Sequence, residues 1–478
     1  MIDFDFRLVS TITFLAYALG VISTYHVIMS SRTSQAAIAW SVSLCTMPFL
    51  ALPIYWIFGR TKFHGYVDAR RGRDRSTRSL IDKTLDRLPD SVPGAGELVP
   101  DQKVIEKLAF MPFTNYNQVD LYTNGGETFA GIFGAMDQAE KYILVQFYIF
   151  RDDGLGRELL RHIRQACDRG VNVYLLYDEI GSARLGKRYL RDLRATGASV
   201  SGFRTTRGPN NRFQLNFRNH RKIVVVDGRV AFVGGYNVGD EYLGKHDRFG
   251  KWRDTHCQIM GPAALALQLS FLSDWFWAQE QVPEGLAWTP ERAPERNEKV
   301  LVVPSGPADD LETWKLLMLQ SIRQADDRFW LVSPYFVPDS DIVSALQLAA
   351  LRGVDVRIML PDKADHLMVW LASFTFLDQM DMPNVQFYRY TPGFLHQKVV
   401  LVDDELAIVG TANADNRSFR LNFEISITGI DPDFIQRVEE MLLEDFKHCR
   451  PTGSDEYRTR PFLFRFAASI CRLMAPVL

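Results

Sequence analysis

Two stretches of the chain repeat one pattern of residues with chemically useful side chains. In each, a histidine is followed two positions later by a lysine, and then by an aspartate, a glycine and an asparagine. The first copy comprises His220, Lys222, Asp227, Gly234 and Asn237, and the second comprises His396, Lys398, Asp403, Gly410 and Asn413. Each member of the second copy follows its counterpart by 176 residues, the interval from His220 to His396. One interval shared by five positions indicates an internal duplication.

These residue types fit the transfer of a phosphodiester. Such a transfer needs a nucleophile, a proton for the leaving oxygen and positive charge near the non-bridging oxygens. Two imidazoles and two ammonium groups around one cavity supply all three without a metal, and the asparagine amides add donors for phosphate oxygens. Each copy alone holds a single imidazole. We therefore predict that the two copies face each other across one shared site, with no cofactor and no metal.

The motif residues need an element that presents them together. Four apolar residues follow each lysine, Ile223–Val226 and Val399–Val402, and they predict buried strands that end at the aspartates. Side chains two residues apart on a strand point to the same face, so each histidine is expected beside its lysine.

The flanking segments predict the same order of elements in both halves. Strands are expected at 142–150 and 171–178 around a helix at 156–169, and again at 329–337 and 354–360 around a helix at 340–351. Strands that alternate with helices predict an α/β sheet in each half.

The paired HxKxxxxD pattern resembles that of the phospholipase D superfamily. Over nearly its whole length the chain resembles the bacterial cardiolipin synthases, including the YWIFGR sequence that begins at Tyr55, with Trp40 and Pro48 upstream of it. The resemblance implies two phospholipase D-like repeats with mixed β-sheets flanked by helices, related by a pseudo-two-fold and preceded by two transmembrane helices.

The resemblance also implies roles for particular residues. The catalytic motifs would supply His220 as nucleophile and His396 as general acid, with lysines and structural aspartates; their members are His220, Lys222, Asp227, His396, Lys398 and Asp403. Asp254 and Glu424, each roughly thirty residues after its histidine, would orient the imidazoles, with surface ion pairing as the alternative. Phosphate binding would fall to Asn237, Asn413 and Gly235. Gly234 and Gly410 either let the backbone approach the phosphate closely or simply form turns. The stretch from Asn413 to Ser418 resembles the family's N-x-D-x-R-S pattern, with Asp415 in place.

The amino-acid composition limits which partners the protein is expected to bind. Lys and Arg total 55 against 57 for Asp and Glu, so overall charge does not favour nucleic acid. The five cysteines are scattered without paired spacing, which suits a reducing compartment and predicts neither a disulfide framework nor a metal site.

Two apolar segments at the N-terminus, about 8–29 and 36–58, predict two transmembrane helices. A cleaved signal peptide is the alternative for the first, but its apolar core is too long and lacks a basic start. Basic residues crowd positions 60–78, which predicts that the catalytic part is cytoplasmic. Together with the family resemblance, this implies a multi-pass protein of the bacterial inner membrane. The same basic run either binds anionic headgroups or acts only as a topology signal.

These features predict six segments. They are a membrane anchor (1–60), a basic connector (61–110), a first phospholipase D-like domain (111–285), a linker (286–298), a second such domain (299–450) and an apolar tail (451–478). The tail either lies on the membrane as an amphipathic segment or packs on the domain.

The resemblance implies cardiolipin synthesis, in which one phosphatidylglycerol transfers its phosphatidyl group to another through a phosphatidyl-histidine intermediate and releases glycerol. The alternatives are a phospholipase D that uses water, another alcohol or phosphatidylethanolamine, a membrane-bound nuclease, and a non-catalytic lipid-binding scaffold. The oligomeric state is left open.

Overall fold

A computed structural model describes residues 6–31, 33–59, 63, 66, 96–206 and 216–475. Most of the predicted basic connector, including the basic run that underlies the topology prediction, lies outside these described residues.

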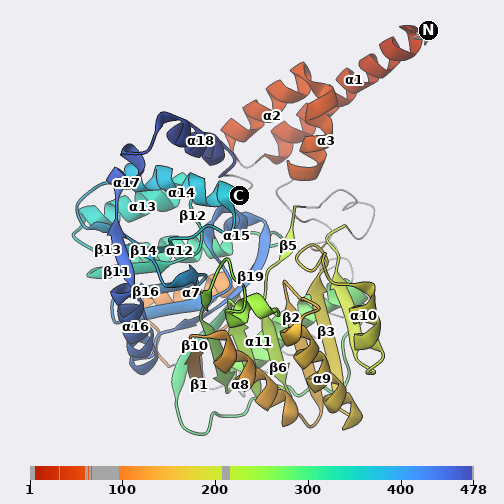
Figure 1. The fold of residues 1–478 in the computed structure, drawn as a ribbon, viewed down its shortest axis with the longest axis vertical. Helices are drawn as coiled ribbons and strands as arrows, with labels where there is room; N and C mark the ends of the chain where they lie inside the picture. Colours follow the sequence, from red (N-terminus) through yellow and green to blue (C-terminus); the bar gives the residue numbers. More distant parts are fainter. Residues whose placement is uncertain are drawn as a thin grey trace.

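One mixed sheet runs through both halves of the chain (Figure 1). Its first-half strands are β1 (Thr114–Tyr122), β2 (Tyr142–Phe147), β3 (Asn172–Asp178), β4 (Ser199–Phe203), β6 (Ile223–Val226), β7 (Val230–Gly234) and β9 (His256–Met260). Its second-half strands are β10 (Glu298–Ser305), β11 (Arg328–Val332), β13 (Asp355–Pro361), β14 (Val385–Tyr390), β16 (Val399–Val402), β17 (Leu406–Gly410), β19 (Asn422–Gly429) and β20 (Cys449–Thr452).

The strand order repeats on either side of the β1–β10 junction. On one side it runs β1-β9-β7-β6-β2-β3-β4, and on the other β10-β19-β17-β16-β11-β13-β14, with β20 at the edge. In each half, three parallel strands (β2-β3-β4 or β11-β13-β14) join an antiparallel hairpin (β6-β7 or β16-β17). The α/β class and the mixed sheets are thus confirmed, while the pseudo-two-fold relation between the halves stays a prediction.

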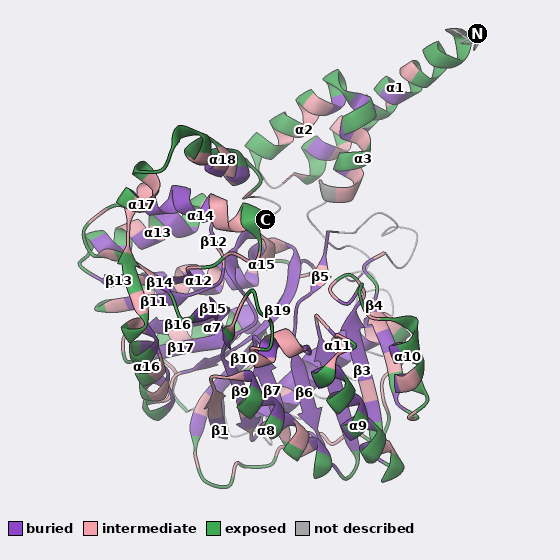
Figure 2. Cartoon of the chain, in the orientation of Figure 1, coloured by how far each residue is buried: buried purple, intermediate pink, exposed green. Residues whose placement is uncertain are grey.

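Helices cover the sheet because its strands are apolar along almost their whole length. Strands β2, β6, β16 and β17 are buried at every residue, which requires cover on both faces (Figure 2). The covering helices include α8 (Gly125–Asp137), α9 (Gly154–Asp168), α11 (Ala263–Gln279), α12 (Thr313–Gln324), α13 (Ser340–Leu351) and α16 (Pro432–Lys447).

The predicted flanking elements are present with small differences at their ends. The helix expected at 340–351 is α13 with the same bounds, and the one at 156–169 is α9, shifted by one or two residues. The strand expected at 329–337 divides into β11 and β12 (Phe336–Val337), because Pro334 has no N–H to continue the pairing.

The motif histidines and lysines do not lie on the strands that follow them, so that prediction was wrong. Strand β6 begins at Ile223 and β16 at Val399, one residue after each lysine. The histidines instead belong to segments that cross between the halves. The backbone N–H of His220 donates to the Phe423 carbonyl at 2.9 Å, and that of His396 donates to the Arg253 carbonyl at 2.7 Å. Short parallel pairs beside them, β5 (Arg218–Asn219) with β19 and β15 (Gly393–Leu395) with β8 (Lys251–Arg253), make the same crossing.

The motif aspartates close the turns after β6 and β16. Both adopt positive φ, 54° for Asp227 and 46° for Asp403. The Asp227 carboxylate accepts the backbone N–H groups of residues 140–142 at 2.8 to 2.9 Å, and the Asp403 carboxylate accepts those of residues 326–328 at 2.6 to 3.0 Å. Each aspartate therefore fixes the start of the neighbouring strand and lies at the far end of its own strand from the motif histidine.

The N-terminal apolar segments form three helices rather than two. Helix α1 (Phe6–Ser30) is followed by α2 (Ser34–Thr46) and α3 (Pro48–Phe58), and among the described residues only Arg7–Ser30 is long and apolar enough by itself to cross a membrane. The break falls at Met47 because the following Pro48 has no N–H and disfavours helical geometry in the residue before it. A second unbroken span at 36–58 is therefore not what the structure shows.

The chain just after α3 is built into the catalytic core. Phe63 is fully buried against Phe217 and Phe423, with ring centroids 5.1 and 5.9 Å away. Tyr66 is also buried and its hydroxyl donates to Asp274 at 3.1 Å. Phe63 is five positions after the end of α3, a reach of about 18 Å at most. Helix α3 therefore ends within about 18 Å of Phe63, which packs on the residue that precedes Glu424.

Helix α18 (Phe462–Leu473) lies at the same end of the molecule's long axis as α1–α3 (Figure 1). Its inner side packs on α14 (Leu367–Gln379), where Phe464 meets Phe374 with ring centroids 5.1 Å apart. Its outer side exposes a row of large apolar residues: Phe462, Leu463, Phe466, Ile470 and Leu473.

Candidate active site

The two motif histidines are each bonded to a carboxylate from the other half of the chain. Nδ1 of His220 lies 2.8 Å from Oε2 of Glu424, and Nδ1 of His396 lies 2.6 Å from Oδ2 of Asp254. All four side chains are buried. The carboxylates predicted to orient the imidazoles are thus in place, but the pairing is crossed: the carboxylate that follows each motif bonds to the histidine of the other motif.

The crossed bonds fix the tautomer of both imidazoles. A carboxylate can only accept, so Nδ1 carries the proton in each ring and Nε2 keeps a lone pair. Burial lowers the pKa of both imidazoles to about 4, against the opposing effect of the bonded carboxylates. Both rings are therefore neutral in the empty site at neutral pH, each with one unprotonated nitrogen.

Each carboxylate is itself kept charged by its surroundings. Burial pushes up the pKa of both Asp254 and Glu424, but the neighbouring histidine and lysine outweigh it and leave both values lowered. Glu424 also accepts hydrogen bonds from three neutral side chains. These donors are the Thr411 hydroxyl at 2.6 Å, the Ser418 hydroxyl at 2.9 Å and the Asn422 amide at 3.1 Å.

Both motif lysines are buried beside the histidines. Nζ of Lys222 donates to the His220 carbonyl at 2.7 Å, and Nζ of Lys398 bonds to the His396 carbonyl in the same way. Burial lowers the pKa of Lys398 to about 8 and that of Lys222 well below its usual value. Burial destabilises the charged form of both amines, and a nearby anion stabilises it again, so the site favours an anion.

A cavity of about 580 Å³ lies between the halves, and His220 and His396 both line it. Its wall also contains Asn237, Asn413, Asp415 and Arg417, together with apolar residues from the start of α14. The structure therefore places both histidines and both asparagines at one site, as the duplication predicted.

The two asparagines are held differently. The Asn237 side chain accepts the Ile149 N–H at 3.1 Å and donates to the Tyr242 hydroxyl at 3.2 Å. The Asn413 amide lies 3.4 Å from Asp415, and its Oδ1 is buried with no hydrogen-bond partner within the described part of the chain. Both asparagines line the cavity, and both already have one partner for the side-chain NH2 group.

Gly235 packs against the carboxylate that orients His396. A Cβ atom at this position would overlap the Asp254 side chain. Glycine at this position therefore leaves room for the Asp254 carboxylate. This is a structural reason for glycine in addition to the phosphate-binding role predicted from the sequence.

We expect Gly235→Ala to displace Asp254 and to impair His396. Forcing a methyl group into a packed site costs about 1–3 kcal/mol, so the free energy of unfolding should fall by that amount and turnover should fall at least tenfold. Gly134→Ala on α8 is the control, because a Cβ there meets no atom within 4 Å. Denaturant titration and turnover of both variants check this. Normal turnover in Gly235→Ala would contradict the role given to this glycine.

Sequence reasoning missed several residues that line the cavity. Tyr148 packs on the His220 ring with centroids 4.9 Å apart, and Trp252 packs on the His396 ring at 5.2 Å. Tyr335 lines the opposite wall and bonds to Asp365. A signal for the tyrosines was available, since Tyr148 and Tyr335 each follow a corresponding apolar strand, YILVQF and FWLVSP.

Known proteins share this sequence and fold. A family described as "Cardiolipin synthase, PLD-like domain" matches residues 132–248 and 318–446, and one described as "Phospholipase_D-nuclease N-terminal" matches residues 18–60. Cardiolipin synthase A of Pseudomonas fluorescens is 44% identical over 467 residues, which cover 97% of each chain. Cardiolipin synthase A of Pseudomonas putida is 44% identical over 473 residues, again with 97% of each chain covered.

The structure of phosphatidylserine synthase from Haemophilus influenzae Rd KW20 is similar, with a TM-score of 0.60 at 14% identity, and covers 80% of this chain and 100% of its own. That likeness shows the fold alone. Fold, paired motifs and relatives together define a phospholipase D-like phosphatidyltransferase that acts on membrane phospholipid. Within that class, the chain belongs to the cardiolipin synthase family.

Proposed function

We propose that this enzyme transfers the phosphatidyl group of one phosphatidylglycerol to the glycerol hydroxyl of another, which gives cardiolipin and free glycerol. The observation that carries the proposal is the pair of imidazoles on one cavity, each with Nδ1 bonded to a carboxylate. Because Nδ1 is engaged, Nε2 is the reactive nitrogen of each ring. Two such nitrogens provide both a nucleophile and an acid for one phosphodiester.

The first half-reaction would begin when Nε2 of His220 attacks phosphorus. The P–N bond forms while the bond to the glycerol oxygen breaks. His396, which takes up a proton on Nε2 once the bound phosphodiester anion has raised its pKa, gives that oxygen its proton. Glu424 stabilises the positive charge that develops on the His220 ring. The two lysines, buried beside the histidines, would stabilise the charge on the phosphate oxygens from behind the cavity wall, and the NH2 group of Asn413 would donate to these oxygens.

The second half-reaction would reverse these roles. His396, now neutral, takes the proton from the hydroxyl of the incoming phosphatidylglycerol. That oxygen attacks phosphorus, the P–N bond breaks, and His220 leaves with its lone pair restored. The same steps with water in place of the second lipid would give phosphatidate, so the choice of acceptor decides between a synthase and a phospholipase.

The direct test is lipid analysis of the purified enzyme in vesicles of phosphatidylglycerol alone. We expect cardiolipin and glycerol in equal amounts, with phosphatidate as a minor product. Phosphatidate as the main product would favour the hydrolase instead. If cardiolipin forms only after phosphatidylethanolamine is added, then phosphatidylethanolamine rather than phosphatidylglycerol is the donor.

The pH dependence should differ between free and substrate-bound enzyme. Burial holds the pKa of both imidazoles at about 4 in the empty site. A bound phosphodiester anion stabilises the imidazolium and so raises these values. Because kcat/KM reports the free enzyme and kcat the complex, both limbs of the kcat profile should lie at higher pH than those of kcat/KM. Limbs of kcat at the same or lower pH would contradict this electrostatic account.

We further propose that the catalytic part is cytoplasmic and that α1, with α2 and α3, anchors it in the bacterial inner membrane. Basic residues at 60–78 support this orientation. A reporter fused after Leu478 should be active only if it is of a cytoplasmic type. Activity of a periplasmic reporter at that position would reverse the topology.

The same arrangement gives α18 a role at the membrane surface. Its exposed apolar row includes Leu463 and Leu473, which are 76% and 79% exposed, and it lies at the same end of the molecule as α1–α3. Exposed Leu367 and Met368 at the start of α14 line the mouth of the cavity beneath it. An apolar surface at this place would bring the cavity mouth to the lipid headgroups.

A further inference from the structure

Synthesis of cardiolipin brings two phosphates into one site, because the product carries one at each end of a glycerol bridge. The transferred phosphate lies between the histidines, whereas the phosphate of the acceptor lipid stays intact and needs a place of its own. We propose that Arg218 and Arg417 form the binding site for that second phosphate. This inference rests on the proposed function and extends it to the recognition of the acceptor.

Both arginines lie on the wall of the cavity next to His220. Arg218 is on β5, two residues before His220, a separation of about 7 Å along extended chain. Arg417 is on α15 (Asn416–Arg420), and its guanidinium donates to the Asn216 side chain at 3.0 Å and to its carbonyl at 2.7 Å. One phosphate at the histidines and another at the arginines would thus be separated by a distance that a short glycerol bridge can span.

Tyr148 connects the arginine pair to the nucleophile. Its ring packs on His220, and Nζ of Lys222 lies 5.5 Å from the ring centre. Burial raises the pKa of the Tyr148 hydroxyl, and the positive charges of Arg218 and Arg417 oppose that rise, so both guanidinium groups are near the same ring. A lipid phosphate beside the arginines would place its glycerol over Tyr148, next to the transferred phosphate.

The duplication shows that the two arginines are not repeated on the other side of the cavity. The positions related to Arg218 and Arg417 by the interval of 176 residues are Phe394 and Glu241. Phe394 packs on Trp252 and His396, and Glu241 pairs with Arg151 at 3.5 Å. At these two positions the His396 side therefore has an aromatic ring and a glutamate, while the His220 side has two arginines.

Charge also favours an anion between the arginines. Burial lowers the pKa of Arg417, and the like charge of Arg218 adds to that effect. Asp415 offsets part of the charge, but burial raises the pKa of this carboxyl to about 6. A phosphate diester keeps its negative charge at every physiological pH, and guanidinium groups bind phosphate oxygens with paired N–H donors.

The test compares two acceptors that differ in having a phosphate. Wild-type enzyme, Arg218→Gln and Arg417→Gln are given phosphatidylglycerol vesicles with labelled free glycerol, so that cardiolipin formation and glycerol exchange compete for one intermediate. We expect the ratio of cardiolipin to exchanged glycerol to fall at least tenfold in each variant. The ratio of cardiolipin to exchanged glycerol should fall less in Arg417→Lys than in Arg417→Gln, because lysine retains the positive charge.

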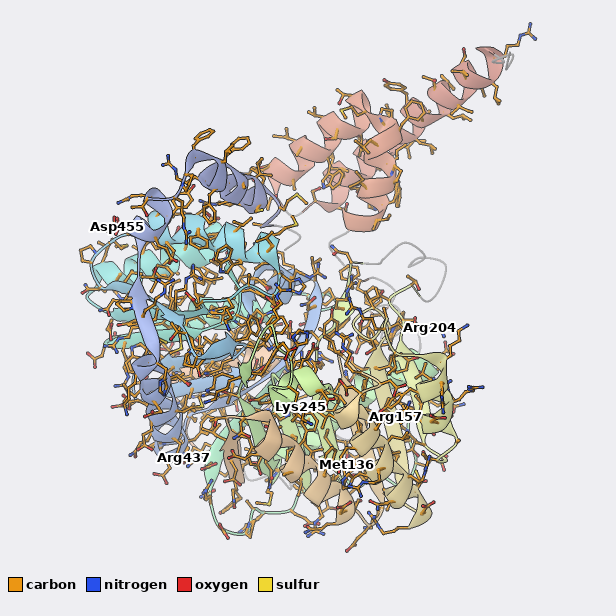
Figure 3. All side chains as sticks on the ribbon, in the orientation of Figure 1. Met136, Arg157, Arg204, Lys245, Arg437 and Asp455 are labelled. Carbon is orange, nitrogen blue, oxygen red and sulfur yellow. The ribbon has the colours of Figure 1, made fainter. Side chains whose placement is uncertain are left out.

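Arg157→Gln is the control, since Arg157 lies on the outer surface of α9 and pairs with Asp152 and Asp192 (Figure 3). It should have the wild-type ratio. If cardiolipin and exchange fall in parallel in both arginine variants, the arginines act on the donor phosphate and the subsite is wrong. If the wild-type enzyme exchanges glycerol but never makes cardiolipin, the proposed function fails, and the acceptor subsite fails with it.

Discussion

His220→Ala should form no covalent lipid adduct, whereas His396→Ala should accumulate one. The donor is a lipid labelled in its phosphatidyl part and fitted with a good leaving group, so that it needs little help from an acid. Without His220 there is no nucleophile, and overall turnover should fall by about four orders of magnitude or more. Without His396 the adduct still forms, but its resolution lacks a base.

The expected label in His396→Ala is a phosphoramidate on His220, which acid cleaves and base does not. Peptide mapping after quenching in base checks both its position and its chemistry. Label that appears only in His220→Ala, on His396, would reverse the two roles while leaving the shared site intact.

Glu424→Gln should show the same kind of defect as His220→Ala, and Asp254→Asn the same kind as His396→Ala. The reason is that each carboxylate bonds to the histidine of the other half. An amide in place of the carboxylate can present its N–H to Nδ1 and favour the wrong tautomer, and it removes the charge that stabilises the imidazolium. We expect kcat to fall about a hundredfold or more in each variant.

Double variants distinguish crossed from uncrossed pairing. In the double variant with His220→Ala, Glu424→Gln should reduce turnover little further, since its partner is already gone. In the double variant with Asp254→Asn, it should cause a further loss of turnover. Labelling gives a second readout: adduct formation should fail in Glu424→Gln and adduct resolution should fail in Asp254→Asn. The opposite assignment would mean that each carboxylate acts within its own half.

Much of the scaffold could be predicted because local pattern specifies it. The short apolar runs favour buried strands, and they form β2, β6 and β16. The periodic pattern at Ser340–Leu351 favours an amphipathic helix, which is α13. The shared site could be predicted as well, because two incomplete motifs make chemical sense only together.

The crossing could not be predicted from the sequence. Glu424 is 204 positions from His220, and Asp254 is 142 positions from His396, so nothing local distinguishes these pairs from the nearer ones. The crossing depends on how the segments before β6 and β16 lie across the opposite half. The burial of Phe63 likewise depends on a tertiary pocket formed by Phe217 and Phe423.

The break between α2 and α3 shows the opposite kind of error. Pro48 lies within the apolar segment 36–58, and because membrane helices often tolerate proline, the sequence alone predicts one span there. The structure places it at the first position of a new helix, where proline needs no hydrogen-bond acceptor.

The stereochemistry at phosphorus tests the central claim, a two-step transfer through one histidine, most directly. The donor would be phosphatidylglycerol with a chiral phosphorothioate at its phosphorus, and the configuration would be read in the cardiolipin that forms. Two successive in-line displacements, first by His220 and then by the acceptor hydroxyl, predict net retention of configuration. Net inversion would mean a single displacement by the acceptor lipid, and it would contradict the covalent mechanism built on the paired histidines.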